Sequence, residues 1–272
     1  MQVLIAGSQE SVAIERPDFV FDPLDPWARI FREALSALDF GGLHIFDAGC
    51  GSGSEVIQLL HQSAPRAVVL NDRSEQVMDV ALRNVAQYNG HISVRSCVGD
   101  VTDVLAHWKG EKLDRIIGCL PQVPAAGDDL AAGDTMAHEY DEQKHSVFKE
   151  WGLGLLFDLK RASRRALVPS GSLVLVHSGR VPERIRAEMD AQAGFRETRV
   201  ICERMIKHHS GTPLSCLFGI ADQVLFSDPD KCCPISAEEA EKLRLAFVSG
   251  EILEPDYRVY HSVLVVESVP VW

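Results

Sequence analysis

The amino-acid sequence predicts an α/β fold in which helices cover both faces of a seven-stranded, mostly parallel sheet. Short apolar runs alternate with amphipathic segments along most of the chain, which is the pattern of strand–helix–strand units. A glycine-rich turn separates the first apolar run from the first amphipathic segment. Hydrophobic residues make up 46% of the 272 residues, which is ample for one large core.

The expected elements follow one another in a regular order. We expect strands near residues 43–47, 67–71, 91–97, 113–119, 172–177, 197–205 and 214–222. Helices are expected near 54–63, 74–88, 101–108, 145–167 and 182–193. A helix near 236–248 and an apolar strand at 257–267 come last. The chain thus divides into an N-terminal helical cap segment (1–40), a main domain (41–226) and a C-terminal extension (227–272) packed on the same domain.

Charge and cysteine content exclude several classes of protein. The net charge of -12 argues against binding to the phosphate backbone of nucleic acids. The seven cysteines are odd in number and show no C-x-x-C spacing, so neither a disulfide framework nor a zinc site is expected. We expect no metal at His208-His209 either, because neighbouring strand residues point to opposite faces. Without a signal peptide or an apolar stretch of about 18 residues, we expect a cytoplasmic protein that does not bind membranes.

The turn after the first predicted strand carries the strongest functional signal. Asp47 is followed by glycines at every second position, Gly49, Gly51 and Gly53, before the next helix begins. Glycines let the backbone approach a ligand closely, and the start of a helix offers free N–H groups. The G-x-G-x-x-G fingerprint of nicotinamide cofactors does not fit, because its third glycine is replaced by Ser54.

Two further acids end the next two strands of the predicted sheet. Asp72 comes nineteen residues after Gly53, where a carboxylate can accept both hydroxyls of a ribose. Asp100 follows the third strand, in a position where it could also cap the helix that begins at Val101. Since the carboxyl ends of parallel strands meet at one edge, we expect these acids to lie beside the glycine turn.

The pattern D-x-G-x-G-x-G resembles motif I of the class I S-adenosylmethionine-dependent methyltransferases, which have a Rossmann-like fold. The resemblance implies that S-adenosylmethionine is the co-substrate, that the leading acid contacts its amino-acid end, and that the glycines face its sulfonium and ribose. It also implies that Asp100, or the backbone beside it, meets the adenine amino group. The expected cofactor-binding residues are Asp47, Gly49, Cys50, Gly51, Gly53, Asp72, Arg73, Gly99, Asp100, Val101, Cys119 and Leu120.

The exit of the fourth strand indicates what receives the methyl group. Many amino-group methylases carry N-P-P-Y here, with a polar first residue that holds a planar amine. This chain has Cys119 and Leu120 before Pro121, so the polar residue is missing. A thioether, which has no proton to bind, would suit such a site better. The side chain of Gln122 could still supply an acceptor, so an amine or amide N-methyltransferase stays open.

Further segments resemble the methionine S-methyltransferases. Residues 117–123 are similar to their G-C-I-P-Q segment, 151–156 to a G-L-G-L helix, 178–180 to a G-G-R turn, and 258–264 to a tail segment. The resemblance implies methylation of L-methionine to S-methylmethionine, which starts dimethylsulfoniopropionate synthesis in some bacteria. Because a thioether sulfur loses no proton, we expect direct in-line attack without a general base and no catalytic residue beyond positioning and desolvation.

The substrate site follows from the same segments. Arg180, after the fifth strand, can bind a carboxylate with both arms of its guanidinium, although a surface role at the helix start is equally open. His261 is expected as a hydrogen-bond partner or as a buried strand histidine, and Trp27 as a cofactor cover or a core residue. The substrate-binding residues expected are Arg180, Tyr140, Glu139, Tyr260, His261, Pro121 and Gln122, with Glu139 and Tyr140 on the ammonium group. A catalytically inert cofactor-binding subunit, and a homodimer formed through the C-terminal segment, also remain open.

Overall fold

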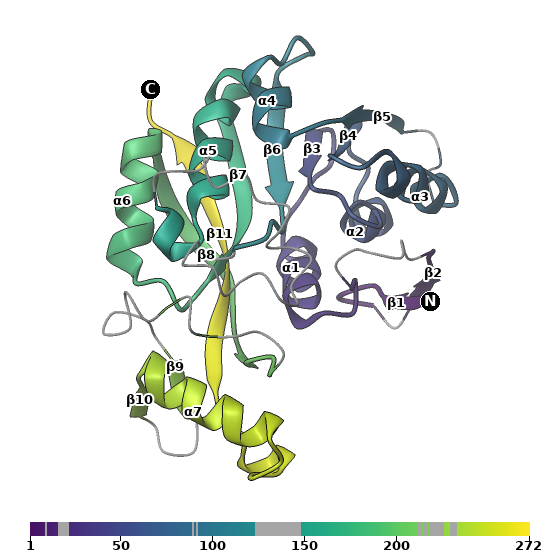
Figure 1. Cartoon of the computed structure of the whole chain (residues 1–272). Coiled ribbons are helices and arrows are strands. Elements are labelled where there is room, and N and C mark those ends of the chain that lie inside the picture. Colours follow the sequence, from purple (N-terminus) through teal and green to yellow (C-terminus); the bar gives the residue numbers. More distant parts are fainter. Residues whose placement is uncertain are drawn as a thin grey trace.

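The structure is a computed structural model that describes residues 1–8, 10–15, 22–88, 90, 92–122, 148–210, 214, 217, 226–228 and 233–272. Its main feature is a mostly parallel sheet with helices on both faces, as the sequence predicts (Figure 1). No helix among the described residues combines the length and the apolar character needed to cross a bilayer.

Seven strands form the body of the sheet. In spatial order they are β5 (Ser93–Val98), β4 (Ala67–Asp72), β3 (His44–Ala48), β6 (Leu113–Gly118), β7 (Leu167–Ser178), β11 (Tyr260–Pro270) and β8 (Phe195–Lys207). The first five are parallel, and β11 is antiparallel to both of its neighbours. The order reverses direction between β3 and β6, and ligands of such sheets bind at the carboxyl ends of the strands beside this switch.

Each face of the sheet has its own core. Along β7, Leu173 and Leu175 face one side, and Val174 and Val176 face the other, as the two-residue period of a strand requires. The first core includes side chains of α4 (Val101–Ala106), α5 (Gly154–Ala166) and α6 (Glu183–Ala193). The second includes α1 (Pro26–Ser36), α2 (Ser54–Gln62) and α3 (Glu75–Ala86). The expected helices are therefore present on both faces, but α5 begins at Gly154 and not near residue 145, because a 3-10 turn at Lys149–Trp151 precedes it.

One strand of the sheet comes from the expected C-terminal extension. We expected a strand at 214–222, of which the structure describes only Leu214 and Leu217. The strand β11, within the expected C-terminal extension, instead lies between β7 and β8, shown in yellow beside the green strands of Figure 1. Its run Val263–Val266 is buried, which suits a strand covered on both faces. The C-terminal segment therefore completes the sheet rather than only packing on it.

The remaining elements lie at the two ends of the chain. A hairpin of β1 (Gln2–Leu4) and β2 (Ser11–Ala13), which the sequence analysis did not predict, precedes α1. Near the other end, β9 (Phe226–Asp228) pairs with β10 (Cys233–Ile235) and touches the start of β11. The helix α7 (Ala237–Val248) lies beside them at one end of the molecule (Figure 1). Short 3-10 turns span Lys149–Trp151 and Glu254–Asp256.

Candidate functional site

The glycine turn between β3 and α2 has the backbone that its sequence indicates. Gly49, Gly51 and Gly53 have φ angles of 67°, 51° and 77°, a left-handed conformation that other residues rarely adopt. A Cβ atom on Gly49 would lie 2.7 Å from Leu120 Cδ2, and one on Gly53 would lie 2.9 Å from a methyl of Val85. The turn is thus packed tightly against the exit of β6 and against α3.

Asp72, at the end of β4, meets the glycine turn directly. Its Oδ2 accepts a hydrogen bond from Gly51 N at 3.2 Å, and its Oδ1 accepts one from Ser74 N at 3.1 Å. Partial burial raises the pKa of the Asp72 carboxyl, and the backbone hydrogen bonds around it oppose that change. The structure therefore brings together two parts of the predicted cofactor site, at the ends of β3 and β4, that lie 21 residues apart in the sequence.

Asp47, the leading acid of the motif, is only 2% exposed. Its Oδ2 has no hydrogen-bond partner among the described residues. Burial raises the pKa of this carboxyl well above its usual range, and the nearby charges of Glu55 and Asp72 add to the effect. An unpaired buried carboxylate oxygen is costly, and a cationic group of a ligand would satisfy it. The residues present therefore fit a cofactor that carries an ammonium and a sulfonium group.

The exit of β5 is shaped by a buried asparagine that the sequence analysis did not single out. Asn71 Nδ2 donates to the carbonyl oxygens of Cys97 (2.9 Å) and Gly99 (3.1 Å). Asp100 caps α4, because its Oδ1 accepts hydrogen bonds from both the N–H and the hydroxyl of Thr102, at 2.9 and 2.6 Å. Its capping role is thus confirmed, and its contact with an adenine stays a prediction. The sequence feature that could have identified Asn71 is a polar amide near the end of an otherwise apolar strand.

In residues 119–122, the described part of the β6 exit, the one amide side chain is already hydrogen-bonded to β7. Burial raises the pKa of the Cys119 thiol well above its usual value, so the thiol keeps its proton. Leu120 is buried against Gly49. Gln122 donates from Nε2 to Val176 O at 2.8 Å and accepts at Oε1 from Ser178 N at 2.9 Å. Its amide therefore fastens the β6 exit to β7, a structural role that the sequence did not reveal.

Parts of the expected substrate site lie outside the described residues. Glu139 and Tyr140, expected on the substrate ammonium, are among residues 123–147, for which no structure is described. Pro121 is half-buried at the β6 exit. The structure thus leaves the predictions for the two loop residues untested.

The exit of β7 places Arg180 at the same edge of the sheet. Arg180 is half-buried, and its Nε donates to the hydroxyl of Ser178 at 2.9 Å. Gly179 N donates to Ser262 O at 2.8 Å, and a Cβ on Gly179 would lie 1.8 Å from the hydroxyl of Ser262. Only glycine fits between β7 and β11 at this point. The G-R pair of the sequence therefore places the guanidinium beside the first residues of β11.

Four rings gather near Arg180 and form what we call the aromatic cluster. The ring of His261 lies 5.8 Å from Trp27, 5.9 Å from His208 and 6.2 Å from Phe226, measured between centroids. His261 is 4% exposed, and burial, followed by the charge of Arg180, lowers the pKa of its imidazole well below its usual value. His261 is therefore neutral at physiological pH. The sequence analysis did not assign His208 or Phe226 to the site.

Tyr260 immediately precedes His261 of this cluster in the sequence. It is half-buried, begins β11 and pairs with Lys207 of β8 and with Ser227 of β9. Trp27 reaches the cluster from the first turn of α1.

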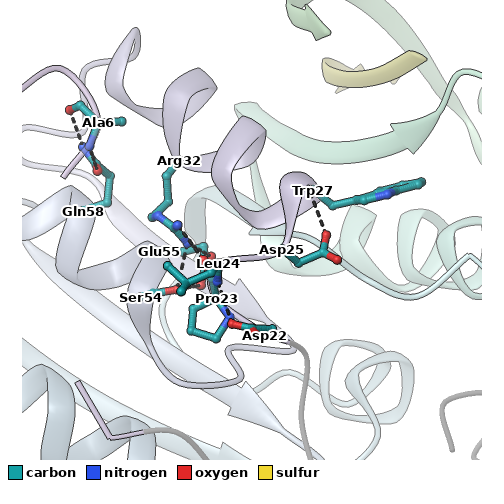
Figure 2. Close-up of polar contacts among 10 residues, drawn as sticks. All are labelled: Ala6, Asp22, Pro23, Leu24, Asp25, Trp27, Arg32, Ser54, Glu55 and Gln58. Carbon is teal, nitrogen blue, oxygen red and sulfur yellow. Dashed lines mark hydrogen bonds and ion pairs between the residues drawn. The ribbon is translucent and has the colours of Figure 1, made fainter. Parts of the chain in front are cut away.

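A buried arginine anchors α1 to the start of α2. Arg32 donates to Pro23 O at 2.6 Å, to the hydroxyl of Ser54 at 3.3 Å and to the Glu55 carboxylate at 3.4 Å (Figure 2). Asp25 and Trp27 point away from these contacts, toward one common side (Figure 2). The first turn of α1 therefore presents an acid and an aromatic ring on the side away from Arg32.

Comparisons with known proteins agree with this geometry. Residues 39–212, more than half of the chain, match the family model described as a methyltransferase domain. The chain is 24% identical over 225 residues, 73% of its length, to the methionine S-methyltransferase of Zea mays, of which the match covers only 20%. A methyltransferase-like protein of Bacillus halodurans C-125 superposes with a TM-score of 0.51 at 15% identity, covering 91% of this chain and 99% of that one. The YcgJ protein of Bacillus subtilis gives 0.49 at 12% identity, covering 88% and 96%.

The Bacillus halodurans structure supports the fold alone, and the family match extends this to activity. The match covers β3 to β8, and thus the glycine turn, Asp72 and the exits of β5, β6 and β7. The sequence prediction of a Rossmann-like fold is confirmed. The chain therefore belongs to the methyltransferase domain family and is a class I S-adenosylmethionine-dependent methyltransferase.

Proposed function

We propose that the chain transfers the methyl group to the thioether sulfur of L-methionine and so forms S-methylmethionine. The observation that carries this proposal is the exit of β6, where a protonated thiol, a buried leucine and an engaged glutamine replace the acceptor of an amino-group methylase. The distant resemblance to the maize methionine S-methyltransferase supports the same substrate. The chain spans about a fifth of that relative, so the comparison by itself settles no substrate.

The chemistry of a thioether matches this exit. An amine or amide must be held by a hydrogen-bond acceptor and must lose a proton, whereas a thioether has lone pairs and no such proton. The oxygen of Gln122, the acceptor that kept N-methylation open, already accepts Ser178 N. The half-buried Cys119 and the buried Leu120 would instead keep water away from the sulfur.

The cofactor would be held by residues already described. Its amino-acid end would lie at Asp47 and the glycine turn, its ribose hydroxyls at Asp72, and its adenine near Asp100. When bound, S-adenosylmethionine supplies a methyl group activated by a sulfonium charge. The protein then has to hold the substrate sulfur in line with that methyl group, which is a task of positioning.

The carboxylate of the substrate would bind Arg180. This guanidinium lies at the carboxyl edge of the sheet and close enough to His261 for its charge to lower the pKa of that imidazole. We expect Arg180→Ala to raise the KM for methionine about tenfold or more, because a charge-assisted bidentate contact is lost, and to leave the affinity for the cofactor unchanged. Arg184→Ala, which removes an exposed arginine in the first turn of α6, is the matched control.

The reaction itself is tested with the purified chain and methyl-labelled S-adenosylmethionine. A panel of thioethers, amines and amides is offered, and the labelled product is identified by mass. We expect label on the sulfur of methionine. Label on nitrogen or oxygen would overturn the proposal. Complete loss of turnover on replacing one ionisable side chain, such as His261→Phe, with methionine binding intact would show that the site uses a base, and would also overturn it.

A further inference from the structure

Asp25 has a carboxylate oxygen that its capping role does not use. The residue is the N-cap of α1, and its Oδ1 accepts a hydrogen bond from Trp27 N at 2.8 Å. None of the described residues hydrogen-bonds to Oδ2. The side chain is half-buried, and this burial raises the pKa of the carboxyl. The capping bond therefore compensates only part of what burial of this acid costs.

Capping alone does not account for an acid at this position. Asparagine and serine cap helices about as well as aspartate does, without a charge that has to be desolvated. Elsewhere in the chain, Ser74 and Ser236 cap α3 and α7 through their hydroxyls, and Asp100 caps α4 through its carboxylate. The capping bond and the charge of His209 oppose the effect of burial on the pKa of Asp25 only in part, and Oδ2 can accept a cationic group of a ligand.

The surroundings of Asp25 place it in the substrate region. Its charge acts on the buried thiol of Cys119, so the carboxylate lies close to the exit of β6. Trp27, which Asp25 positions through the capping bond, lies with its ring 5.8 Å from His261. His261 in turn lies close to Arg180. The acid at the N-cap of α1 and the guanidinium at the exit of β7 are thus both neighbours of the aromatic cluster.

We propose that Asp25 binds the ammonium group of an α-amino-acid substrate while Arg180 binds its carboxylate, with the rings of Trp27 and His261 beside these two charged side chains. This inference rests on the proposed function, since it takes the substrate to be a zwitterion. It assigns the ammonium to a residue of α1, where the sequence analysis assigned it to Glu139 and Tyr140. The side chain of the amino acid would then extend toward Cys119 at the β6 exit.

Asp25→Asn tests the assignment, because asparagine keeps the helix cap and removes only the charge. The full-length protein is titrated with L-methionine in the presence of S-adenosylhomocysteine, and turnover is measured with S-adenosylmethionine. We expect the Kd and KM for methionine to rise about tenfold or more. The Kd for S-adenosylhomocysteine should not change. Both measurements are then repeated with 3-(methylthio)propionate, which lacks the ammonium group. This compound should bind the wild type and the variant equally.

Asp22→Asn is the matched control. It makes the same charge change three residues earlier, and Asp22 Oδ1 likewise accepts a backbone hydrogen bond, from Leu24 N at 2.9 Å. This variant should bind methionine as the wild type does. If both variants weaken methionine equally, or if Asp25→Asn weakens 3-(methylthio)propionate as much as methionine, the effect is not recognition of the ammonium and the inference is overturned.

The outcomes separate this inference from the proposed function. A wild-type protein that neither binds nor methylates methionine overturns the proposed function and this inference with it. A wild-type protein that methylates methionine, with an Asp25→Asn variant of unchanged KM and Kd, overturns the role of Asp25 alone.

Discussion

At the scale of single residues, the cofactor site is a place where negative charge is concentrated. Asp47, Glu55 and Asp72 lie close enough that the charges of Glu55 and Asp72 raise the pKa of Asp47. One of the three, Glu55, has a cationic partner in Arg32 at 3.4 Å. Such a group of carboxylates is unfavourable in the absence of a ligand and becomes favourable with a cationic one. The site thus suits the ammonium and sulfonium charges of S-adenosylmethionine.

The clearest residue-scale prediction concerns Asp72. Asp72→Ala removes the expected acceptor of the ribose hydroxyls and the acceptor of Gly51 N. We expect the Kd for S-adenosylmethionine, measured by calorimetry, to rise roughly 10- to 100-fold, since each hydrogen bond to a charged group contributes about 1.5–3 kcal/mol. Glu75→Ala, which removes an exposed acid three residues away, should leave the Kd unchanged. An unchanged affinity in a folded Asp72→Ala variant would contradict the ribose assignment.

The sequence predicted those site residues whose placement follows from strand ends. Gly51 and Asp72 are hydrogen-bonded because β3 and β4 are parallel neighbours with their carboxyl ends at one edge. The role of Gln122 was not predictable, because it depends on how a loop folds back on β7, more than fifty residues away. The aromatic cluster draws its rings from α1, β9, β11 and the end of β8, and no spacing in the sequence relates those segments.

At the scale of elements, two side-chain amides hold the N-terminal segment on the helices of one face. Gln58 of α2 accepts Ala6 N at 2.7 Å and donates to Ala6 O at 3.2 Å (Figure 2). Asn84 of α3 makes the same pair of bonds with Glu15, at 2.7 and 2.9 Å, and also donates to Ser52 O at 2.9 Å. Asn84 therefore links the N-terminal segment to the glycine turn.

Replacing Asn84 should therefore affect both stability and the cofactor site. Asn84→Ala leaves the buried carbonyl of Ser52 and the backbone of Glu15 without their partner, and we expect urea unfolding to show a loss of about 1–3 kcal/mol. The Kd for S-adenosylmethionine should rise as the turn loosens. Gln87→Ala, whose exposed amide bonds only to its own helix, should change stability by less than about 0.5 kcal/mol. Equal stability of the two variants would show that Asn84 does not hold this segment.

The helices and strands that the sequence predicted best are those whose hydrophobic pattern extends over many residues. The helices α2, α3 and α6, of 9, 12 and 11 residues, begin and end within about two residues of their expected bounds, because each is long enough to display the helical period. The strands β1 and β2 have three residues each, which is too short for an alternating pattern to stand out. The run that forms β11 was recognised as a strand, but its place between β7 and β8 depends on pairing that the sequence does not display.

At the scale of the whole molecule, the C-terminal strand joins the active edge to the opposite end of the sheet. The start of β11 carries His261, whereas Ser268 near its end belongs to a buried polar group. Lys160 of α5 donates to Asp190 of α6 at 2.6 Å and to the hydroxyl of Ser268 at 3.0 Å, and that hydroxyl donates to Asp190 at 2.9 Å. Burial lowers the pKa of Lys160, and the charge of Asp190 opposes this. The group fixes β11 against both helices of this face.

Buried histidines make the stability of the molecule depend on pH. His177 of β7 and His261 of β11 are buried, and burial lowers the pKa of each well below its value of 6.5. Below about pH 6.5 the unfolded chain takes up protons at these positions that the folded chain does not, so acidification favours unfolding. Asp47, whose pKa is raised, acts in the opposite direction, because the folded chain binds its proton more readily.

A single substitution isolates the contribution of one histidine from these opposing effects. Nδ1 of His177 has no hydrogen-bond partner among the described residues, so His177→Leu removes an unsatisfied polar atom and a titrating group at similar volume. Urea unfolding at pH 5, 6 and 7 should show that the free energy of unfolding of the wild type falls more steeply with acidification than that of the variant. Below the unfolded-state pKa, each pH unit should cost the wild type up to about 1.4 kcal/mol more than the variant. At pH 7, where both forms of the wild type are neutral at this site, the variant should be about as stable or slightly more so. Parallel pH profiles would mean that His177 takes up its proton in the folded protein, and that the charges of Lys160 and Arg186 beside it do not keep it neutral.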